Sequence, residues 1–376
     1  MAGIYLHIPF CKQACHYCDF HFSTNQQFKA DMVAAIREEI NLRQDYLGAE
    51  AIKTIYFGGG TPSLLSSEEI KALLDLIHVR FAVERNVEIT LEANPDDLNS
   101  EKLASLRAAG INRLSIGIQS FHNKQLKLLN RAHDTESANA CVQDARAAGF
   151  DNISIDLIYA IPDESDQLWV EDIEEALSLQ PEHISCYALT IEPQTVFGKW
   201  AKYGKLRITE DEVAARHLEI LMDKLEDAGY EHYEVSNFAK PGYYSKHNSS
   251  YWKGETYLGV GPSAHSYNKE SRQFNIANNH LYMRAISKGT VPFEKEILTK
   301  ADKINEFILT SLRTSWGCDT QKLSKGFEYD LLQDQNSYVK KIIGAGYAEL
   351  NSTTLVLTKK GKLLADKIAS DLFITP

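Results

Sequence analysis

Residues 4–18 read IYLHIPFCKQACHYC, a short apolar run followed by three cysteines within eight residues. The near-continuous apolar side chains predict a buried strand over Ile4–Ile8. Cys11, Cys15 and Cys18 then lie in a loop at the carboxyl end of that strand. Clustered thiols of this kind indicate metal or redox chemistry rather than structural disulfide bonds in a cytosolic protein.

Several kinds of site compete for these thiols. A dithiol redox centre leaves one cysteine without a role, and c-type heme attachment needs a histidine where Asp19 stands. Structural zinc with His16 or His21 as fourth ligand is an alternative, although zinc ligands usually come as two separated pairs. An iron–sulfur cluster accepts three thiolates and leaves one of four irons open to a ligand, so we favour a [4Fe–4S] cluster. We expect the scattered cysteines to be small buried residues: Cys141, Cys186 and Cys318.

Composition narrows the class of protein. The chain has 376 residues, ordinary globular composition and a net charge of −11, which disfavours binding to a phosphate backbone. No apolar run approaches the length of a membrane span, and the first residues lack the layout of a signal peptide. We expect a cytoplasmic protein with no membrane span and no nucleic-acid partner, although peripheral membrane association is compatible with the sequence.

Strand-like and helical segments alternate over the first 235 residues. This alternation predicts an α/β fold, a partial (β/α) TIM-type barrel whose chemistry lies at the carboxyl ends of its strands. The expected strands are Ile4–Ile8, Thr54–Phe57, Glu88–Glu92, Arg113–Ile118, Asn152–Ile158, His183–Leu189 and Tyr230–Val235.

Helix ends carry their own signals. Ser66 with Glu69, and Thr209 with Glu212, have the spacing of capping boxes. We expect three glycines to end helices in the left-handed conformation: Gly110, Gly149 and Gly229.

The strand–helix alternation fades after Val235. We divide the chain into a barrel domain of residues 1–235, a bridging segment of 236–295 and a C-terminal module of 296–376. The module is expected to be a small α+β, winged-helix-like unit with helices near 300–314, 330–343 and 360–371 and a hairpin between the last two. Its 11 basic and 10 acidic residues favour packing or partner binding over DNA binding.

The C-x3-C-x2-C spacing resembles that of the radical S-adenosyl-L-methionine (SAM) superfamily. In that superfamily the open iron chelates SAM, and one electron cleaves it to a 5′-deoxyadenosyl radical. The motif GGGTP at 58–62 ends the second strand and resembles the loop that holds the SAM amino group. Glu92 ends the third strand, where a carboxylate can accept ribose hydroxyls. Asp156 lies inside an apolar strand, where it needs a partner such as SAM or Arg131.

More of the chain resembles one family within that superfamily. YLHIPFC at 5–11, EANP at 92–95, SIGIQSF at 115–121 and DLIY at 156–159 are similar to the oxygen-independent coproporphyrinogen III oxidases. The resemblance extends into the C-terminal module. It implies that the three cysteines bind the cluster and that SAM is bound by Tyr5, Tyr17, Gly60, Thr61, Glu92, Gln119, Arg131, Asp156 and Ala188.

Two departures from that family and one further motif point to its HemW branch, the heme chaperones. The oxidases carry a further cysteine where Phe20 stands, and an N-terminal extension before a motif that begins here at residue 11. HNSSYW at 247–252 resembles the signature of the HemW branch. Neutral imidazole is a good axial ligand of heme iron and aromatic faces suit a porphyrin, so the heme candidates are His247, Tyr251 and Trp252. His265 is a second candidate ligand.

A second glycine-rich segment does not indicate a dinucleotide site. GVGPSA at 259–264 has the form of a dinucleotide fingerprint, but Pro262 disturbs the required geometry and no acidic residue follows about 20 positions on.

These features together predict a protein that binds a [4Fe–4S] cluster, SAM and heme and transfers heme to acceptor apoproteins, with an electron donor as a further partner. We expect it to lack coproporphyrinogen oxidase activity. The alternative is an oxygen-independent coproporphyrinogen III oxidase acting through the 5′-deoxyadenosyl radical. A third hypothesis is a zinc- or cluster-stabilised scaffold that docks partners through its C-terminal module.

Overall fold

The computed structural model describes residues 2–375. Its main feature is a twelve-stranded sheet in the order β12-β11-β10-β9-β1-β2-β3-β4-β5-β6-β8-β7. Strands β1 to β6 pair in parallel in chain order, which confirms the partial TIM-type barrel. Their bounds are Ala2–Ile8, Ile52–Gly59, Val83–Ala93, Arg113–Gln119, Ile153–Tyr159 and His183–Ala188.

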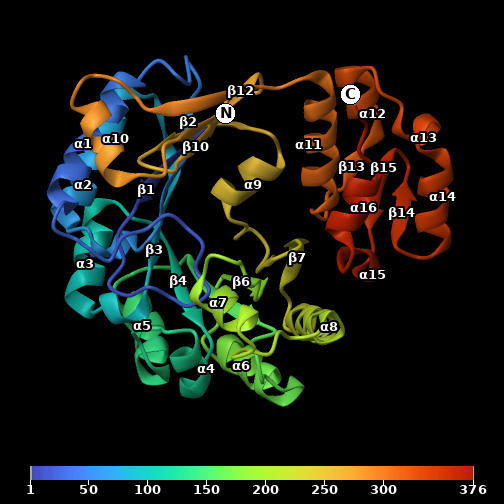
Figure 1. The fold of residues 1–376 in the computed structure, drawn as a ribbon, viewed down its shortest axis with the longest axis horizontal. Helices are drawn as coiled ribbons and strands as arrows, with labels where there is room; N and C mark the ends of the chain where they lie inside the picture. The colour runs from blue at the N-terminus through green and yellow to red at the C-terminus, as the bar shows by residue number, and fades with distance from the viewer. Residues whose placement is uncertain (1, 376) are drawn as a thin grey trace.

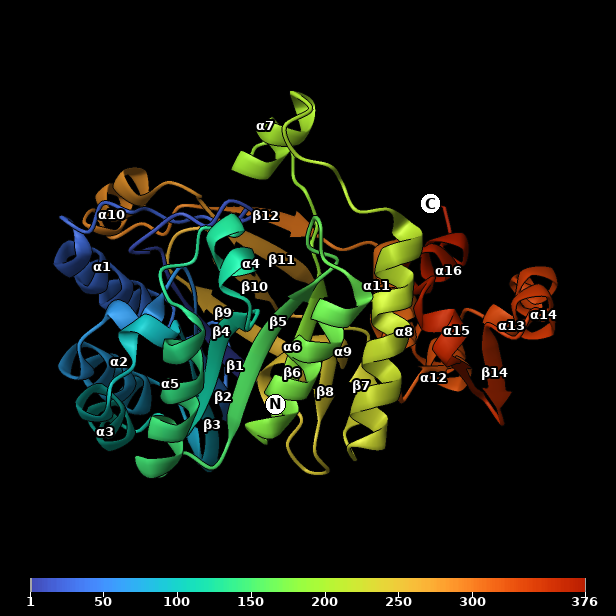
Figure 2. The same cartoon turned by 90° about the horizontal axis from the view of Figure 1, so that it is seen from below.

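Helices follow the strands and cover the outer face of this curved sheet (Figure 1). Figure 2 shows α7 projecting from the body at the top of that view. The helices are α1 Lys29–Leu42, α2 Ser67–Arg80, α3 Ser100–Ala109, α4 Asn123–Leu128, α5 Thr135–Ala147, α6 Asp166–Ser178, α7 Val196–Lys202 and α8 Asp211–Asp227, with single 3-10 turns at Pro62–Leu64 and Pro95–Asp97.

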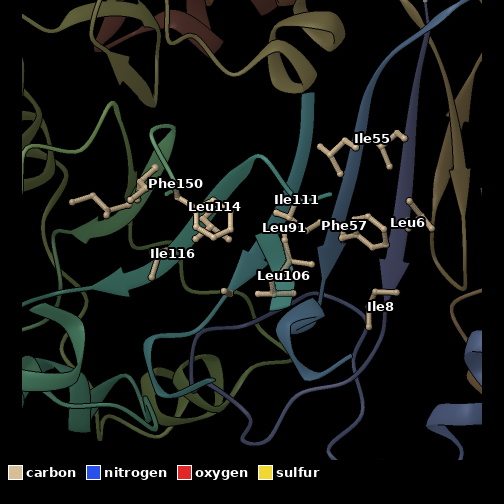
Figure 3. Close-up of a cluster of buried hydrophobic side chains, with 14 of the residues drawn as sticks. Leu6, Ile8, Ile55, Phe57, Leu91, Leu106, Ile111, Leu114, Ile116 and Phe150 are labelled. Carbon is tan, nitrogen blue, oxygen red and sulfur yellow. The ribbon is translucent and has the colours of Figure 1, made fainter. Parts of the chain in front are cut away.

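The strands alternate between an apolar outer face and a polar inner face. Leu6 and Ile8, Ile55 and Phe57, Leu91, and Leu114 and Ile116 belong to one buried cluster with the helices (Figure 3). Successive side chains of a strand point to opposite faces. The residues between these apolar positions therefore point into the barrel, and among them are Tyr5, Tyr56, Glu92, Arg113 and Ser115.

The helix-end predictions are confirmed except for one. Ser66 and Glu69 form the expected capping box at the start of α2. Gly110, Gly149 and Gly229 all have positive φ angles. The predicted box at Thr209 is wrong, because α8 begins after Glu210 and no side chain caps it.

The segment after Val235 contains strands that the sequence pattern did not predict. β7 (Glu231–Glu234) does not extend the parallel series, because β8 (Asn237–Ala239) inserts between it and β6 in antiparallel pairing. At the other edge β9 (Thr256–Val260) pairs in parallel with β1. Antiparallel strands and two helices complete the segment: β10 His265–Tyr267, β11 Ser271–Asn275, β12 Phe293–Ile297, α9 Lys246–Trp252 and α10 Asn279–Ile286.

A buried polar network joins α1 to these added strands. The carboxylate of Glu39, which is fully buried, accepts hydrogen bonds from the Gly261 N–H (2.8 Å), Asn275 Nδ2 (2.8 Å) and the Tyr282 hydroxyl (2.6 Å). Arg43 Nη1 lies 3.4 Å from Glu39 Oε1 and supplies the compensating charge. The second glycine of the GVGPSA segment has a steric reason. A Cβ at Gly261 would lie 2.5 Å from the backbone oxygen of His7.

The C-terminal module has its own hydrophobic cluster and lies beside the barrel, with α9 on the side that faces it (Figure 1). Two of its expected helices are each broken in two, and the sequence pattern missed β13 and α12. The elements are α11 Lys300–Leu312, β13 Cys318–Asp319, α12 Thr320–Phe327, α13 Leu331–Asp334, α14 Asn336–Gly344, β14 Ala348–Asn351, β15 Thr354–Leu357, α15 Lys359–Lys362 and α16 Ala365–Asp371.

No helix in the described part of the chain combines the length and apolar character needed to cross a membrane.

Candidate functional site

The polar inner face and the cysteine loop enclose one cavity of about 570 Å³. Its wall includes all three cysteines of the loop and eight of the nine residues that the resemblance assigns to SAM. These are Tyr17, Gly60, Thr61, Glu92, Gln119, Arg131, Asp156 and Ala188.

Backbone hydrogen bonds fix the cysteine loop against neighbouring segments. The Cys11 N–H donates to the Ser23 carbonyl (3.1 Å), and the His16 N–H donates to that of Leu129 (3.1 Å). Asn130 Nδ2 donates to the Ala14 carbonyl (2.7 Å). The loop is thus held at several points, and its three half-buried thiols form no disulfide bonds.

Each histidine of the zinc alternative has one ring nitrogen engaged in a hydrogen bond away from the thiols. The His16 Nδ1 is hydrogen-bonded to the Leu128 carbonyl (2.9 Å), and the His21 Nε2 to Asn279 Oδ1 (2.7 Å). Within residues 2–375 no three His, Cys, Asp or Glu side chains converge on the position of a single metal ion. Cys141, Cys186 and Cys318 are all buried, as expected.

Arg131 joins the cysteine loop to the barrel. Its Nη1 lies 3.3 Å from the sulfur of Cys15, and its Nη2 donates to Asn94 Oδ1 (2.5 Å) and to the Gly117 carbonyl (2.7 Å). It forms no ion pair with Asp156, although its positive charge lowers the pKa of that carboxyl group. Asp156 instead accepts a hydrogen bond from Ser115 Oγ (3.2 Å), and burial raises its pKa to about 6.

Gly60 lies where the end of β2 meets the start of the cysteine loop. Its N–H donates to the Ile8 carbonyl (2.9 Å). A Cβ at this position would lie 2.6 Å from the Phe10 carbonyl oxygen and 2.8 Å from that of Ile8. The contact is with backbone atoms, which cannot rotate away, so only glycine allows this close approach.

We therefore expect Gly60→Ala to displace the cysteine loop and weaken SAM binding at least tenfold, because a Cβ cannot fit without moving the backbone of Phe10. Equilibrium binding of SAM to the anaerobically reconstituted protein measures this. Gly326→Ala is the matched control, because nothing lies within 4 Å of a Cβ there. Equal SAM affinities for the two variants would contradict the prediction.

Glu92 lies at the end of β3 inside the cavity. Its carboxylate accepts hydrogen bonds from the Tyr56 hydroxyl (2.8 Å) and the Gly59 N–H (3.2 Å). Burial raises the pKa of Glu92 to about 7, with a further increase from the charge of Asp156. Two buried carboxyl groups side by side favour a ligand that presents hydroxyl donors.

The raised pKa gives a prediction for stability. The folded protein keeps a proton on Glu92 that the unfolded chain, with a pKa of about 4.3, releases; stability therefore falls as pH rises from about 4 to about 7. We expect the free energy of unfolding of Glu92→Gln to decrease by about 1 to 3 kcal/mol less than that of the wild type between pH 5 and pH 8. Urea unfolding of the cluster-free protein at both pH values tests it. Glu349→Gln, at an exposed position, should keep the wild-type slope, and a wild-type slope in Glu92→Gln would refute the prediction.

Gln119 ends β4 in a strained conformation. Its φ of 73° lies in the left-handed region, and the register between β4 and β5 shifts at this point. A non-glycine residue in this region costs of order 1 kcal/mol, and such strain gathers at ligand sites. The strained residue lies at the cavity, whose wall includes Gln119.

Tyr5 is the one SAM candidate that does not line the cavity. Its hydroxyl is hydrogen-bonded to His7 Nδ1 (3.2 Å), and its ring stacks on Tyr56 with centroids 6.0 Å apart. In this structure Tyr5 supports the wall behind Tyr56.

The HNSSYW segment forms α9, which packs on β1 and β2. His247 is buried with both ring nitrogens engaged: Nδ1 with Thr54 Oγ1 (2.8 Å) and Nε2 with the Tyr251 hydroxyl (2.7 Å). Its ring also stacks on Tyr56 at 4.9 Å. Neither His247, Tyr251 nor Trp252 lines the cavity.

The remaining candidates lie elsewhere. Trp252 packs under the guanidinium of Arg313 from the C-terminal module, 5.4 Å from the ring centroid. His265 is exposed and lies edge-on to Phe274 at 4.8 Å. The structure thus does not bring the heme candidates together at one cavity.

Arg113 and Asn248 are among the cavity residues that the sequence did not single out. Arg113 opens a strand that is otherwise apolar, the same signal that singled out Asp156. Asn248 adjoins the histidine of the HNSSYW segment, which drew attention to the imidazole instead.

Comparison with known proteins agrees with this architecture. The sequence model of the Radical SAM superfamily matches residues 5–176, and that of the HemN C-terminal domain matches 298–364. The solved structure of coproporphyrinogen III oxidase (HemN) from Escherichia coli, a radical SAM enzyme, superimposes with a TM-score of 0.86 at 25% identity, covering 99% of this chain and 90% of that one.

Curated relatives match over nearly the full length. Heme chaperone HemW of Bacillus subtilis is 37% identical over 98% of this chain and 98% of its own. Heme chaperone HemW of Mycobacterium tuberculosis is 34% identical over 98% of this chain and 94% of its own. On this full-length similarity, and with the two family domains in the same order, the chain belongs to the HemW branch of the radical SAM superfamily.

Proposed function

We propose that this protein binds a [4Fe–4S] cluster through Cys11, Cys15 and Cys18 and binds SAM in the adjoining cavity. One observation carries the proposal: three free thiols and eight of the nine SAM candidates form the wall of a single cavity. The residues present fit these groups, because the thiols share one fixed loop and the carboxyl groups can accept hydroxyl donors. When bound, the cluster and SAM supply one-electron chemistry; the chain supplies position.

The chain's own groups divide this task. Gly60 and Thr61 keep the second strand close to the cysteine loop, and Arg131 places a positive charge beside Cys15. Glu92 and Asp156 provide acceptors deeper in the barrel, where water has limited access.

We further propose that the protein binds heme and transfers it to acceptor apoproteins in the cytoplasm. The support is the similarity over 98% of the chain to relatives named heme chaperones. His247, Tyr251 and Trp252 remain the first candidates for heme contact. To ligate iron, His247 has to release either Thr54 or Tyr251, whereas His265 is exposed as it stands.

Anaerobic reconstitution followed by hemin titration tests the proposal. We expect about four irons and four sulfides per chain, a Soret shift on titration, and transfer of the bound heme to an apocytochrome-type acceptor. His247→Ala and His265→Ala, titrated side by side, identify the ligand by which variant loses the shifted Soret band. Absence of heme binding at micromolar hemin in the reconstituted protein would defeat the chaperone proposal.

A second candidate function is oxidative decarboxylation of coproporphyrinogen III. It is favoured by the whole-chain superposition on coproporphyrinogen III oxidase at a TM-score of 0.86. Anaerobic assay with SAM, a reductant and coproporphyrinogen III decides between them, and formation of protoporphyrinogen would establish the oxidase. Iron-free preparations that contain zinc would instead favour a scaffold role.

We propose the same three-part division of the chain, residues 1–235, 236–295 and 296–376, with partner binding assigned to the last part. α9 contacts both β1 and β2 of the barrel and α11 of the C-terminal module. An acceptor or electron donor docked on the module would therefore contact a unit that adjoins the HNSSYW segment.

A further inference from the structure

Arg113 is a buried cation that forms no hydrogen bond and no ion pair within residues 2–375. The residue is 1% exposed and lines the cavity. No hydrogen bond from its guanidinium and no carboxylate within 4.0 Å is found among residues 2–375, and its Nε is buried without any acceptor. Burying an unpaired charge costs several kcal/mol, so such groups in native proteins normally pair with another group.

The nearby carboxyl groups do not fill this role. Asp156 is engaged by Ser115, and Glu92 by Tyr56 and Gly59, and neither forms an ion pair with Arg113. Burial raises the pKa of Asp156 to about 6 and that of Glu92 to about 7, and the positive charge of Arg113 acts against the shift at Asp156. Asp156 thus attracts Arg113 through its charge without forming an ion pair, and the buried Nε–H of the guanidinium has no acceptor among residues 2–375.

Asn248 adds a second polar group to the same cavity. It is the second residue of the HNSSYW segment and lines the cavity, and no hydrogen bond to its side-chain amide is found in residues 2–375. The segment is held in place by His247, whose ring is bonded on both sides, and by Glu88, which accepts the backbone N–H of His247 (3.1 Å). α9 therefore presents Asn248, not the imidazole, to the cavity.

Neither Arg113 nor Asn248 belongs to the residues that the resemblance assigns to SAM. We propose that they form a carboxylate subsite inside the barrel, with Arg113 as the anchor and Asn248 as a second donor. The planar guanidinium matches a carboxylate with paired N–H donors, and an amide N–H adds a further bond. Resting on the proposed function, the occupant we assign is a propionate of the bound tetrapyrrole.

Volume restricts how a tetrapyrrole uses this subsite. About 570 Å³ is the size of a pocket for a single small ligand and cannot enclose a cluster, SAM and a whole macrocycle together. Only a substituent arm extends to Arg113, and the ring stays nearer the mouth. SAM also carries a carboxylate, so the test has to distinguish these two sources.

The experiment compares ligands with and without a carboxylate in the wild type, Arg113→Met and Arg113→Lys, all anaerobically reconstituted. One arm uses hemin and hemin dimethyl ester; the other uses SAM and its decarboxylated analogue. We expect the wild type to bind hemin about tenfold or more tightly than the ester. Arg113→Met should reduce this ratio to within about threefold, and Arg113→Lys should keep most of it. Asn248→Ala should reduce the ratio by a smaller factor.

If Arg113→Met instead lowers the affinity for SAM but not for its decarboxylated analogue, the subsite holds SAM and the tetrapyrrole assignment is overturned. Unchanged ratios in both arms overturn the subsite itself. Thermal unfolding of cluster-free protein gives an independent readout: removal of an unpaired buried cation should leave the midpoint of Arg113→Met equal to or above that of the wild type. A much lower midpoint would show a structural role and would also overturn the proposal.

Failure of this inference is distinguishable from failure of the proposed function. Iron and sulfide content, together with binding of hemin dimethyl ester, report on the cluster and on heme binding without involving a carboxylate. If the protein binds hemin dimethyl ester and gains no affinity from the free carboxylates of hemin, only the subsite is refuted.

Discussion

Changing Cys15 to serine is expected to abolish the cluster while leaving the fold intact. Cys15 is half-buried in a loop held by backbone hydrogen bonds, so its side chain contributes little to packing. Serine is a far weaker ligand for iron than thiolate. After anaerobic reconstitution we expect iron to fall from about four per chain to below about one, with loss of the broad absorption near 400 nm.

Cys141→Ser is the matched control for this experiment. Cys141 is buried in α5, and its thiol donates to the Ala138 carbonyl (3.2 Å), a bond that a serine hydroxyl can replace. The control should retain full iron content. A Cys15→Ser protein with wild-type iron and absorption would remove the cluster proposal and, with it, the assignment of SAM to the cavity.

The largest effect on stability is expected from Arg43→Met. Arg43 is 6% exposed, and its guanidinium lies beside the buried carboxylate of Glu39 while donating to Gln273 Oε1 (2.6 Å) and the Gly259 carbonyl (3.3 Å). Its loss leaves Glu39 as a buried charge without a cation. Breaking a buried pair in this way costs about 3 to 5 kcal/mol, measured as the free energy of unfolding in urea.

Two companion variants define the cause. Arg207→Met removes an exposed arginine paired with Glu210 and should change stability by no more than about 0.5 kcal/mol. Adding Glu39→Gln to Arg43→Met should recover part of the loss, because the carboxylate left unpaired is then neutral. A loss below about 1 kcal/mol in Arg43→Met would contradict the view that this pair fastens α1 to the added strands.

The parallel half of the fold was predictable because each of its strands carries a local signal. Apolar runs ending near Ile8, Phe57 and Ile118 mark buried strands, and Gly110 and Gly149 mark the helix ends between them. The added strands lack such a signal, since β12 is exposed along its whole length and β10 has only three residues. Their positions depend on long-range pairing with β1 and on the Glu39 network, which no local pattern encodes.

The candidate site divides in a similar way. The cysteines, Gly60 and Glu92 lie at strand ends, where topology brings them together. The sequence did not show that both ring nitrogens of His247 are hydrogen-bonded, to Thr54 and Tyr251. A sequence pattern identifies a histidine but not the contacts of its ring. Arg113 was missed for the opposite reason: its lack of a hydrogen-bond acceptor becomes visible only when every neighbour is placed.

The position of β1 inside the sheet has a consequence for synthesis on the ribosome. β1 emerges before the other described strands, yet one of its two neighbours, β9, begins at Thr256. A nascent chain therefore carries the apolar strand that leads into the cysteine loop with one edge unpaired until β9 has been made. Unpaired strand edges invite association with other chains. The edge of β1 that pairs with β9 is thus exposed while residues 9–255 are translated. If the cluster is inserted after release of the chain, the strand before the cysteine loop is already paired on both sides.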